Sequence, residues 1–459
     1  MNWCAPIGLT WRHAFASWID PLGFISSLAR EYGDIAFFRV FWHSCYQLNH
    51  PDLVREVLVV KSRIYQKEPR QMGVLSQFTG KGVINTEGPA WVRQRRILQP
   101  AFQGNTIDTV LDAGNVELLA QFPNKLPREL LLHEELLRLC LQTVARTLYG
   151  SPSSEKAGDL TWSVATISAH LRDEIANPFA LPDWFPSTWK FEKRLALDTL
   201  RTYISELIAE RRRSGQLGND LLGQLLAAED TTGDGKGISD DQIRAEAQTM
   251  LFAAHHTVAT GLTFAIWLLT QHPHIFSEVR SEIDSVLGDR APSRQDHSRL
   301  ALTERVLKEA MRLYPPAWSL FCRQAMEDDE LAGYPIPRGS WVFIHPWVLH
   351  RDGRFFPQPE RFDPSRFLPE RERELPVGAY VPFGLGPHMC IGARMGMAMM
   401  LNLLALLVQR YDFAPTPGQG RMELEPLISI RPKGDIRMIF SPRRASQSLS
   451  ADLQLGASI

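Results

Sequence analysis

The sequence predicts a mainly α-helical protein that carries a minor set of small β-sheets. Apolar residues recur with helical periodicity over residues 91–287, and clusters of proline and glycine interrupt the pattern. The most apolar stretch, residues 249–269, is long enough to form a buried helix. Over residues 313–366 the chain becomes rich in proline, tryptophan, phenylalanine and valine, a composition that favours short strands and their connections.

The first elements follow from local patterns. Residues 21–32 have the spacing of an amphipathic helix, and an apolar alternating stretch over residues 34–41 predicts a strand. The segment Asn-His-Pro-Asp at residues 49–52 is a helix start, so we expect a helix over residues 53–60.

The last elements surround a glycine-rich loop. A strand is predicted over residues 340–344, a helix over 391–411 and a pair of strands around 427–430. Residues 441–459 are rich in serine and alanine, so we expect a flexible C-terminal tail there and a single domain over residues 1–440.

Composition excludes several classes of protein. Of the 459 residues, 44% are apolar and 22% are charged, which excludes disordered, collagen-like and coiled-coil chains. Fifty lysines and arginines balance 51 acidic residues to a net charge of −1, so we expect no nucleic-acid partner.

We also expect no membrane anchor. Polar residues interrupt every apolar stretch among the first twenty residues. The apolar run 249–269 has His255 and His256 at its middle, which favours a helix buried in a soluble protein over a membrane span.

The cysteines argue against a disulfide framework and a zinc knuckle. There are five, no two are close in sequence, and no Cys-x-x-Cys pair exists. A reducing, cytoplasmic setting fits this usage. Most of the cysteines are then expected to be small buried residues, namely Cys4, Cys45, Cys140 and Cys322.

Cys390 lies in a different environment, the loop Phe-Gly-Leu-Gly-Pro-His-Met-Cys-Ile-Gly. Gly386 and Gly392 bracket it and let backbone amides approach the sulfur closely. A helix follows directly, and a helix start favours an anion. The pattern indicates a poised thiolate that serves as a nucleophile or a metal ligand. His388 is two residues away, a spacing that makes it a poor base for a nucleophile, and a buried structural cysteine is the remaining alternative.

This loop resembles the haem-ligand loop of the cytochrome P450 family at Phe383, Gly386, His388, Cys390 and Gly392. The family usually has arginine where this chain has His388, and a histidine can still donate to a haem propionate. The resemblance implies haem b (iron protoporphyrin IX) between the long central helix and the helix after the loop. Cys390 would be the iron ligand.

Two further segments resemble the family's haem-propionate contacts. Trp91 and Arg95 have the Trp-x-x-x-Arg spacing, in which the indole nitrogen and the guanidinium hold propionates. Arg323 matches an arginine of a strand that also contacts a propionate.

A third segment resembles the family's buried ionic triad, which is a structural element. Glu309 and Arg312 have the Glu-x-x-Arg spacing that places both side chains on one helix face. Pro-Glu-Arg-Phe follows at residues 359–362, so Arg361 is the expected third member. With every motif in order, the resemblance covers residues 20–442.

The central helix carries the family's oxygen-side motif in altered form. Ala254 stands where the family usually has glycine, His256 stands where it has an acid, and Thr257 is retained. In the family the acid–threonine pair helps to deliver protons to dioxygen. A histidine such as His256 can relay protons because free imidazole changes its charge near neutral pH, and the alternative is a structural cap of the helix. His255 is expected to be a helix-packing residue.

The implied function is a haem-thiolate monooxygenase that inserts one oxygen atom from O2 into a small hydrophobic substrate of terpene, fatty acyl, sterol or polyketide type. The chain has no flavin or iron–sulfur segment, so electrons would come from a ferredoxin and its reductase or from a flavodoxin. Basic residues beside the cysteine loop, Arg93, Arg96 and Arg394, would form the docking patch.

Two other classes remain open. Loss of the acid at His256 is compatible with a haem-thiolate isomerase, a dehydratase or a peroxide-using enzyme, whereas Thr257 argues against them. A non-catalytic haem sensor is the third class. The resemblance also predicts an apolar substrate pocket, lined by Val83, Ile84, Leu251, Ala253, Trp318, Leu320, Leu427 and Ile428.

Overall fold

The computed structural model describes residues 19–40, 42–122, 128–150, 154–176, 185, 187–218, 220–230, 235, 237–420 and 422–443. Residues 1–18, which include Cys4 and most of the segment in which we expect no membrane anchor, lie outside these ranges. Residues 444–459 of the expected C-terminal tail also lie outside them. Strand β12 (Arg437–Pro442) includes Ser441 and Pro442, so the domain extends past the boundary expected at residue 440.

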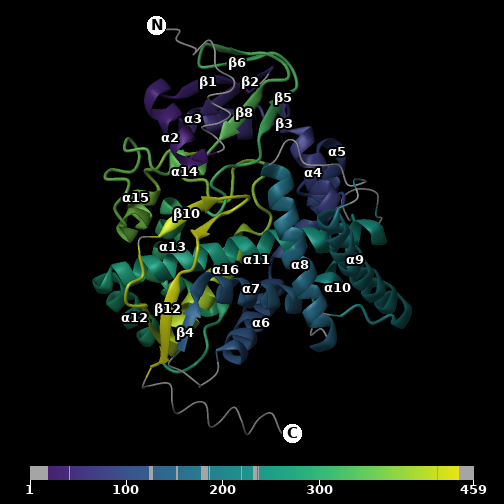
Figure 1. Cartoon of the computed structure of the whole chain (residues 1–459), viewed down its shortest axis with the longest axis vertical. Coiled ribbons are helices and arrows are strands. Elements are labelled where there is room, and N and C mark those ends of the chain that lie inside the picture. Colours follow the sequence, from purple (N-terminus) through teal and green to yellow (C-terminus); the bar gives the residue numbers. More distant parts are fainter. Residues whose placement is uncertain are drawn as a thin grey trace.

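Helix α11 (Asp240–Gln271) crosses the middle of the molecule (Figure 1). Ser239 caps its first turn by accepting from the Gln242 amide, and the apolar run 249–269 lies within it. The helices that pack most extensively against α11 are α7 (Leu132–Tyr149), α13 (Ala301–Leu313) and α16 (Ala393–Arg410). Because α11 is apolar on nearly every face, these helices cover most of it.

Among the described helices, α11 alone is long and apolar enough to cross a membrane, and 72% of its apolar window is buried inside the protein. The sequence-based expectation of a buried core helix is confirmed.

The other helices surround this centre. They are α2 (Pro21–Tyr32), α3 (Pro51–Arg55), a π-helical turn (Glu56–Val60), α4 (Pro69–Thr79), α5 (Gly88–Leu98), α6 (Asn105–Gln121), α8 (Ser154–Ala176), α9 (Thr188–Ser214), α10 (Leu221–Ala227), α12 (Pro273–Leu287), α14 (Pro346–Leu349) and α15 (Pro369–Glu372), with short 3₁₀ turns at Gln99–Phe102, Arg294–Arg299 and Pro364–Phe367.

The largest sheet has the strand order β1-β2-β8-β5-β3 and lies on one side of the molecule (Figure 1). Its strands β2 and β8 are parallel, and its other pairs are antiparallel. The strands are β1 (Ile35–Val40), β2 (His43–Leu48), β8 (Trp341–Ile344), β5 (Arg323–Ala325) and β3 (Tyr65–Lys67).

The smaller sheets are antiparallel. One has the order β4-β12-β9, and two hairpins are formed by β6 with β7 and by β10 with β11. The hairpin β10–β11 turns at residues 427–429, where the sequence predicts a pair of strands. The bounds are β4 (Arg128–Leu131), β9 (Tyr411–Pro415), β6 (Asp329–Leu331), β7 (Tyr334–Ile336), β10 (Glu423–Pro426) and β11 (Ile430–Lys433).

The predicted helix boundaries agree closely with the structure. Helix α2 has the predicted bounds. The helix expected over residues 53–60 starts two residues earlier at Pro51, because His50 provides the N-cap. Cys45, Cys140 and Cys322 are buried free cysteines, as expected.

Candidate active site

The cysteine loop is folded tightly against the start of α16. Gly386 has φ +75°, and a Cβ built on it would lie 2.0 Å from the carbonyl oxygen of Leu58, so no side chain fits there. The Cys390 amide donates to the Phe383 carbonyl at 2.9 Å and closes the loop. Gly392 is the N-cap of α16.

Cys390 differs from the three buried cysteines because its side chain is exposed. The protein still surrounds the sulfur on most sides, and this desolvation raises the pKa of the thiol. The Gly392 amide and the charge of Arg95 lower it by less. At the free thiol, desolvation thus outweighs the helix start and the glycines, and the thiolate expected from the sequence stays a prediction. Binding to a metal cation would keep the sulfur of Cys390 ionised.

Basic and aromatic side chains from distant segments gather beside this loop. The rings of Trp91 and His388 have centroids 4.0 Å apart. Arg95, one helical turn after Trp91 on α5, donates from Nη1 to the Met389 carbonyl at 2.9 Å. The structure thus brings Trp91 and Arg95 of α5 into contact with the loop that carries His388, so three of the predicted haem-contact residues lie together.

Arg323 joins this group from strand β5. It is 7% exposed, and its Nε and Nη1 have no hydrogen-bond acceptor. Burial lowers the pKa of its guanidinium. An unsatisfied buried guanidinium is costly, so this position suits a carboxylate-bearing ligand.

Two further residues of the group escaped the sequence analysis. Glu87 lies 3.3 Å from His388 Nε2 and 3.9 Å from Arg323 Nη1. Lys67 faces Arg323 across the β3–β5 pair, and burial lowers its pKa to about 8. Glu87 directly precedes the predicted Trp91 helix, which could have drawn attention to it. Lys67 carries no comparable motif.

The donor set fits a haem. An accessible thiol, the buried Nε and Nη1 of Arg323, which have no hydrogen-bond acceptor, and the Nδ1 of His388, which also has none, lie on segments joined by the contacts of Trp91 and Glu87. A thiolate ligand with cationic donors for propionate groups is the combination that haem requires.

One face of α11 is accessible over a single turn. Ala253 is exposed and Thr257 is partly exposed, whereas the residues on the opposite face are buried. The Thr257 hydroxyl donates to the Ala253 carbonyl at 2.8 Å. Ala254 and His256 are partly buried and share this face.

Helices α11 and α16 approach each other closely near this turn. A Cβ built on Gly396 would lie 4.0 Å from Val258, the neighbour of Thr257. Gly396 is only six residues after Cys390, so the cysteine loop and the accessible turn of α11 belong to one region. The two adjacent histidines differ within it. His255 is buried, bonds the Leu251 carbonyl through Nδ1 at 2.6 Å, and burial lowers its pKa to about 4, which agrees with the expected packing role.

Several residues of the predicted substrate pocket contact one another or the central core. Trp318 Nε1 donates to the Leu427 carbonyl at 2.6 Å, which joins the segment after α13 to the β10–β11 hairpin. Ile428 at the hairpin tip is 42% exposed. Val83 is buried and Ile84 is partly buried, and both contact the central core.

One pocket prediction is wrong, and another stays a prediction. Leu251 is fully buried in the core on the face of α11 opposite Ala253, because residues two apart on a helix point to different sides. Leu320 is partly exposed and packs against a second hydrophobic cluster, and its place in the pocket stays a prediction.

The predicted triad is also corrected. Glu309 and Arg312 are fully buried and paired at 2.7 Å. Arg361 is exposed and its side chain contacts Gln358, so it is not the third member. Arg366 lies beside Glu309 instead.

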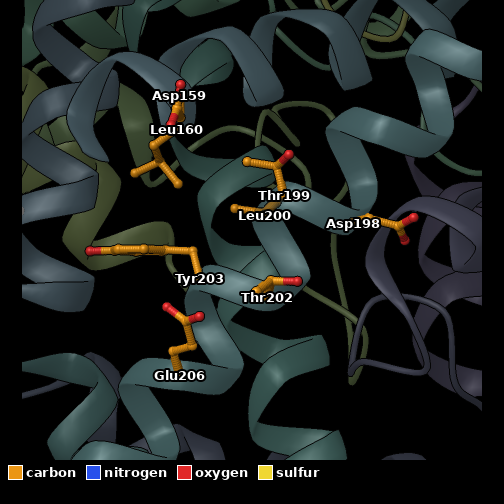
Figure 2. Close-up of a pocket in the computed structure, with 8 residues that line it drawn as sticks. All are labelled: Asp159, Leu160, Asp198, Thr199, Leu200, Thr202, Tyr203 and Glu206. Carbon is orange, nitrogen blue, oxygen red and sulfur yellow. The ribbon is translucent and has the colours of Figure 1, made fainter. Parts of the chain in front are cut away.

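Figure 2 shows a separate cavity of about 390 Å³ between α8 and α9. Its wall includes Tyr203, Glu206 and Asp159, and no predicted site residue lines it. It is therefore distinct from the region of Cys390.

Comparison with known proteins decides the family. The sequence profile described as Cytochrome P450 matches residues 11–438. The chain belongs to the cytochrome P450 family. This membership makes it an oxidoreductase of a monooxygenase family that uses haem.

Individual relatives agree with the P450 assignment. Cyclooctatin synthase of Streptomyces melanosporofaciens is 35% identical over 444 residues, which cover 96% of this chain and 95% of that protein. Pentalenene oxygenase of Streptomyces avermitilis is 32% identical over 441 residues, with the same coverage. The crystal structure of the cytochrome P450DA heme domain has a TM-score of 0.84 at 25% identity, covering 93% of this chain and 94% of that one. The predicted P450 fold is confirmed.

Proposed function

We propose that this P450 is a monooxygenase that inserts one oxygen atom from O2 into a cyclic, terpene-type hydrophobic molecule. The observation that carries the proposal is the grouping of the accessible Cys390 thiol with the buried guanidinium of Arg323, whose Nε and Nη1 have no hydrogen-bond acceptor. The relatives supply the substrate class, since one is named for the oxygenation of pentalenene and another as cyclooctat-9-en-7-ol 5-monooxygenase.

Haem b would be held by this chain's own residues. Cys390 would ligate the iron, while Arg95, Arg323, Trp91 and His388 would donate to the propionates. When bound, the haem supplies the activation of dioxygen. Phe383, Gly386 and Gly392 would keep the loop in the shape that presents the sulfur, and Ala254 would leave room beside the ring.

The accessible turn of α11 would control protons. Thr257 holds its hydroxyl on the Ala253 carbonyl at 2.8 Å, and there it would hold a proton beside the haem-facing side of α11. His256, one residue earlier on the same face, would move a proton towards that hydroxyl. Its ring lies 4.2 Å from the ring of His255.

The substrate chamber would be apolar. Val83, Ile84, Ala253, Trp318, Leu427 and Ile428 would orient a hydrocarbon skeleton and exclude water from the reacting carbon. Electrons would come from a ferredoxin and its reductase or from a flavodoxin, and the enzyme would work in the cytoplasm.

A reconstituted reaction tests the proposal. Purified holoenzyme is supplied with NADPH, a ferredoxin, its reductase and O2, and is offered pentalenene and other cyclic terpenes. We expect an alcohol product carrying one ¹⁸O atom from ¹⁸O2. Product formed from peroxide alone at the same rate, or rearranged product without added oxygen, would favour the peroxide-using or isomerase alternative.

A further inference from the structure

Glu246 is a fully buried acid on the central helix that the proposed chemistry does not use. It precedes Ala253 by seven residues and Thr257 by eleven. At 3.6 residues per turn these are about two and three whole turns, so the three residues lie on one side of α11. The side chain therefore lies on the same side of the helix as the accessible turn, further along its axis, where it is buried.

Both carboxyl oxygens of Glu246 accept from a single backbone amide, that of Val83, at 3.0 and 3.1 Å. This contact joins α11 to the segment between α4 and α5, which the sequence analysis assigns to the substrate wall. No helix or strand pairing involves the Val83 amide, so Glu246 is its partner.

The same segment lies directly on the helix backbone. A Cβ built on Gly82 would lie 2.6 Å from Thr249 Oγ1 and 3.1 Å from Glu246 Oε2. A Cβ built on Gly80 would lie 2.8 Å from the Cβ of Ala245. Glycine at both positions permits this close approach, and a side chain at either one would push the segment away.

A second anchor holds the segment on its other side. The ammonium of Lys67 donates to the carbonyl of Ile84 at 2.7 Å and to that of Thr86 at 3.0 Å. Lys67 itself is paired across strands with Arg323. Val83 and Ile84 are thus held on one side by α11 and on the other side by Lys67 of β3, which pairs with the strand that carries Arg323.

We propose that Glu246 is a specificity-determining positioning residue, whose carboxyl group holds Val83 and Ile84 against α11 and so sets the width of the substrate chamber. The inference rests on the proposed function in one respect, because that proposal assigns Val83 and Ile84 to the chamber wall.

The chemistry of the position favours this role over a purely structural one. Burial of a carboxyl group is unfavourable, and in many cores an apolar residue of equal size is more stable. Burial accordingly raises the pKa of Glu246 to about 7. A costly buried acid is explained by its contact with the Val83 amide, which needs an acceptor at one defined place.

Four variants separate the possibilities. Glu246→Gln keeps an acceptor for the Val83 amide, Glu246→Leu removes it, and Gly82→Ala displaces the segment while leaving Glu246 in place. Gly73→Ala is the control, since a Cβ there meets no atom within 4 Å and the residue lies within α4.

The first measurement is amide hydrogen exchange over residues 80–86 in the holoenzyme. Loss of a buried hydrogen bond predicts exchange roughly 10- to 100-fold faster in Glu246→Leu, with Glu246→Gln close to the unsubstituted protein. Equal exchange rates in Glu246→Leu and the unsubstituted protein would contradict the proposal that Glu246 holds this segment.

The second measurement is the spectral dissociation constant of two azoles, imidazole as a small probe and 4-phenylimidazole as a large one. Glu246→Leu and Gly82→Ala should change the ratio of the two constants at least fivefold, while Gln and the Gly73 control stay within twofold. An unchanged ratio of the two dissociation constants in Gly82→Ala would contradict the proposal, even if Glu246→Leu fails to retain haem. Azole binding needs no turnover, so a failed terpene assay leaves this test intact.

Discussion

Arg366 Nε lies 3.4 Å from Glu309 Oε1, inside a group in which Arg312 is fully buried. Arg312 donates to both oxygens of the same carboxylate and also to the backbone carbonyl of Arg361. The backbone of residue 361 therefore takes part in the network, whereas its side chain does not.

Arg366 and Arg361 should respond differently to substitution. Arg366→Ala leaves Glu309 with one cationic partner fewer, and we expect a loss of about 1 to 3 kcal/mol in the free energy of unfolding. Arg361→Ala should stay within about 0.5 kcal/mol because its side chain is exposed. Urea unfolding of both variants measures this. Equal losses would restore Arg361 to the triad.

Cys390→Ser should abolish the thiolate-type absorption of the reduced carbon monoxide complex, because an alcohol does not replace the thiolate as ligand. Cys140→Ser is the matched control, since Cys140 is a buried cysteine on α7 and does not adjoin a predicted haem-contact residue in the sequence. Persistence of the thiolate spectrum in Cys390→Ser would show that another residue ligates the iron.

His256 should control how efficiently electrons are used. If it supplies protons, His256→Ala should lower the fraction of electrons recovered in product and raise the release of hydrogen peroxide. General acids typically contribute ~100- to 10,000-fold. His256→Glu should retain coupling, and Thr257→Ala should uncouple at least as strongly.

The competing hypothesis makes His256 a structural cap of the helix. It predicts reduced stability or haem retention in His256→Ala, with normal coupling in the protein that survives. Peroxide released per product formed, measured at matched haem content, decides between the two.

Fewer arginines are available for the docking patch than the sequence implies. Arg96 donates from Nε to the buried Asp230 at 2.7 Å, and Arg93 lies 3.7 Å from the same carboxylate. Arg394 is exposed at the start of α16. Arg394→Glu should slow the first reduction at low ionic strength, and the effect should shrink at high salt because salt screens exposed charges.

Arg213→Glu on α9 is the charge-matched control for this measurement. Arg96→Glu is unsuitable, because it places a second carboxylate beside buried Asp230 and should lower stability. Identical reduction kinetics in Arg394→Glu and Arg213→Glu at every ionic strength would remove Arg394 from the docking surface.

Glu246 should make stability fall as pH rises. Burial raises its folded-state pKa to about 7, above the usual carboxyl value of 4.5, so between these values the folded protein retains a proton that the unfolded chain releases. The contribution is lost progressively over this window and amounts to about 3 kcal/mol. Above pH 7 it should no longer change.

Glu246→Gln should remove this slope. The comparison is the difference in unfolding free energy between the two proteins from pH 4.5 to 8, in which other titrating groups cancel. A difference that stays constant with pH would mean that the carboxyl group is not desolvated as the structure indicates.

Local patterns made much of the fold predictable. The bounds of α2 and the buried run within α11 followed from helical spacing, because periodicity reports which face of an element is buried. The cysteine loop was predictable for a similar reason. Glycine at residue 386 is required by a left-handed backbone conformation, and that requirement is visible in the sequence.

The failed predictions share a different cause. Pro-x-Arg-Phe occurs twice, at residues 359–362 and 364–367. Only the first copy has glutamate at its second position, and this match alone favoured it. The chain path brings Arg366 to Glu309 and leaves Arg361 exposed. Leu251 failed similarly, because membership of a motif-rich segment does not specify which side of the helix a residue occupies.

The sequence by itself determined the family, the sulfur ligand candidate and the central helix, since each depends on residues close together along the chain. Only the tertiary structure decided which charged groups meet. Glu246 and Val83 are 163 residues apart, and Lys67, Glu87 and Arg323 come from three separate segments. A buried charge is stable only where partners converge on it in space, and spacing along one segment carries no record of that convergence.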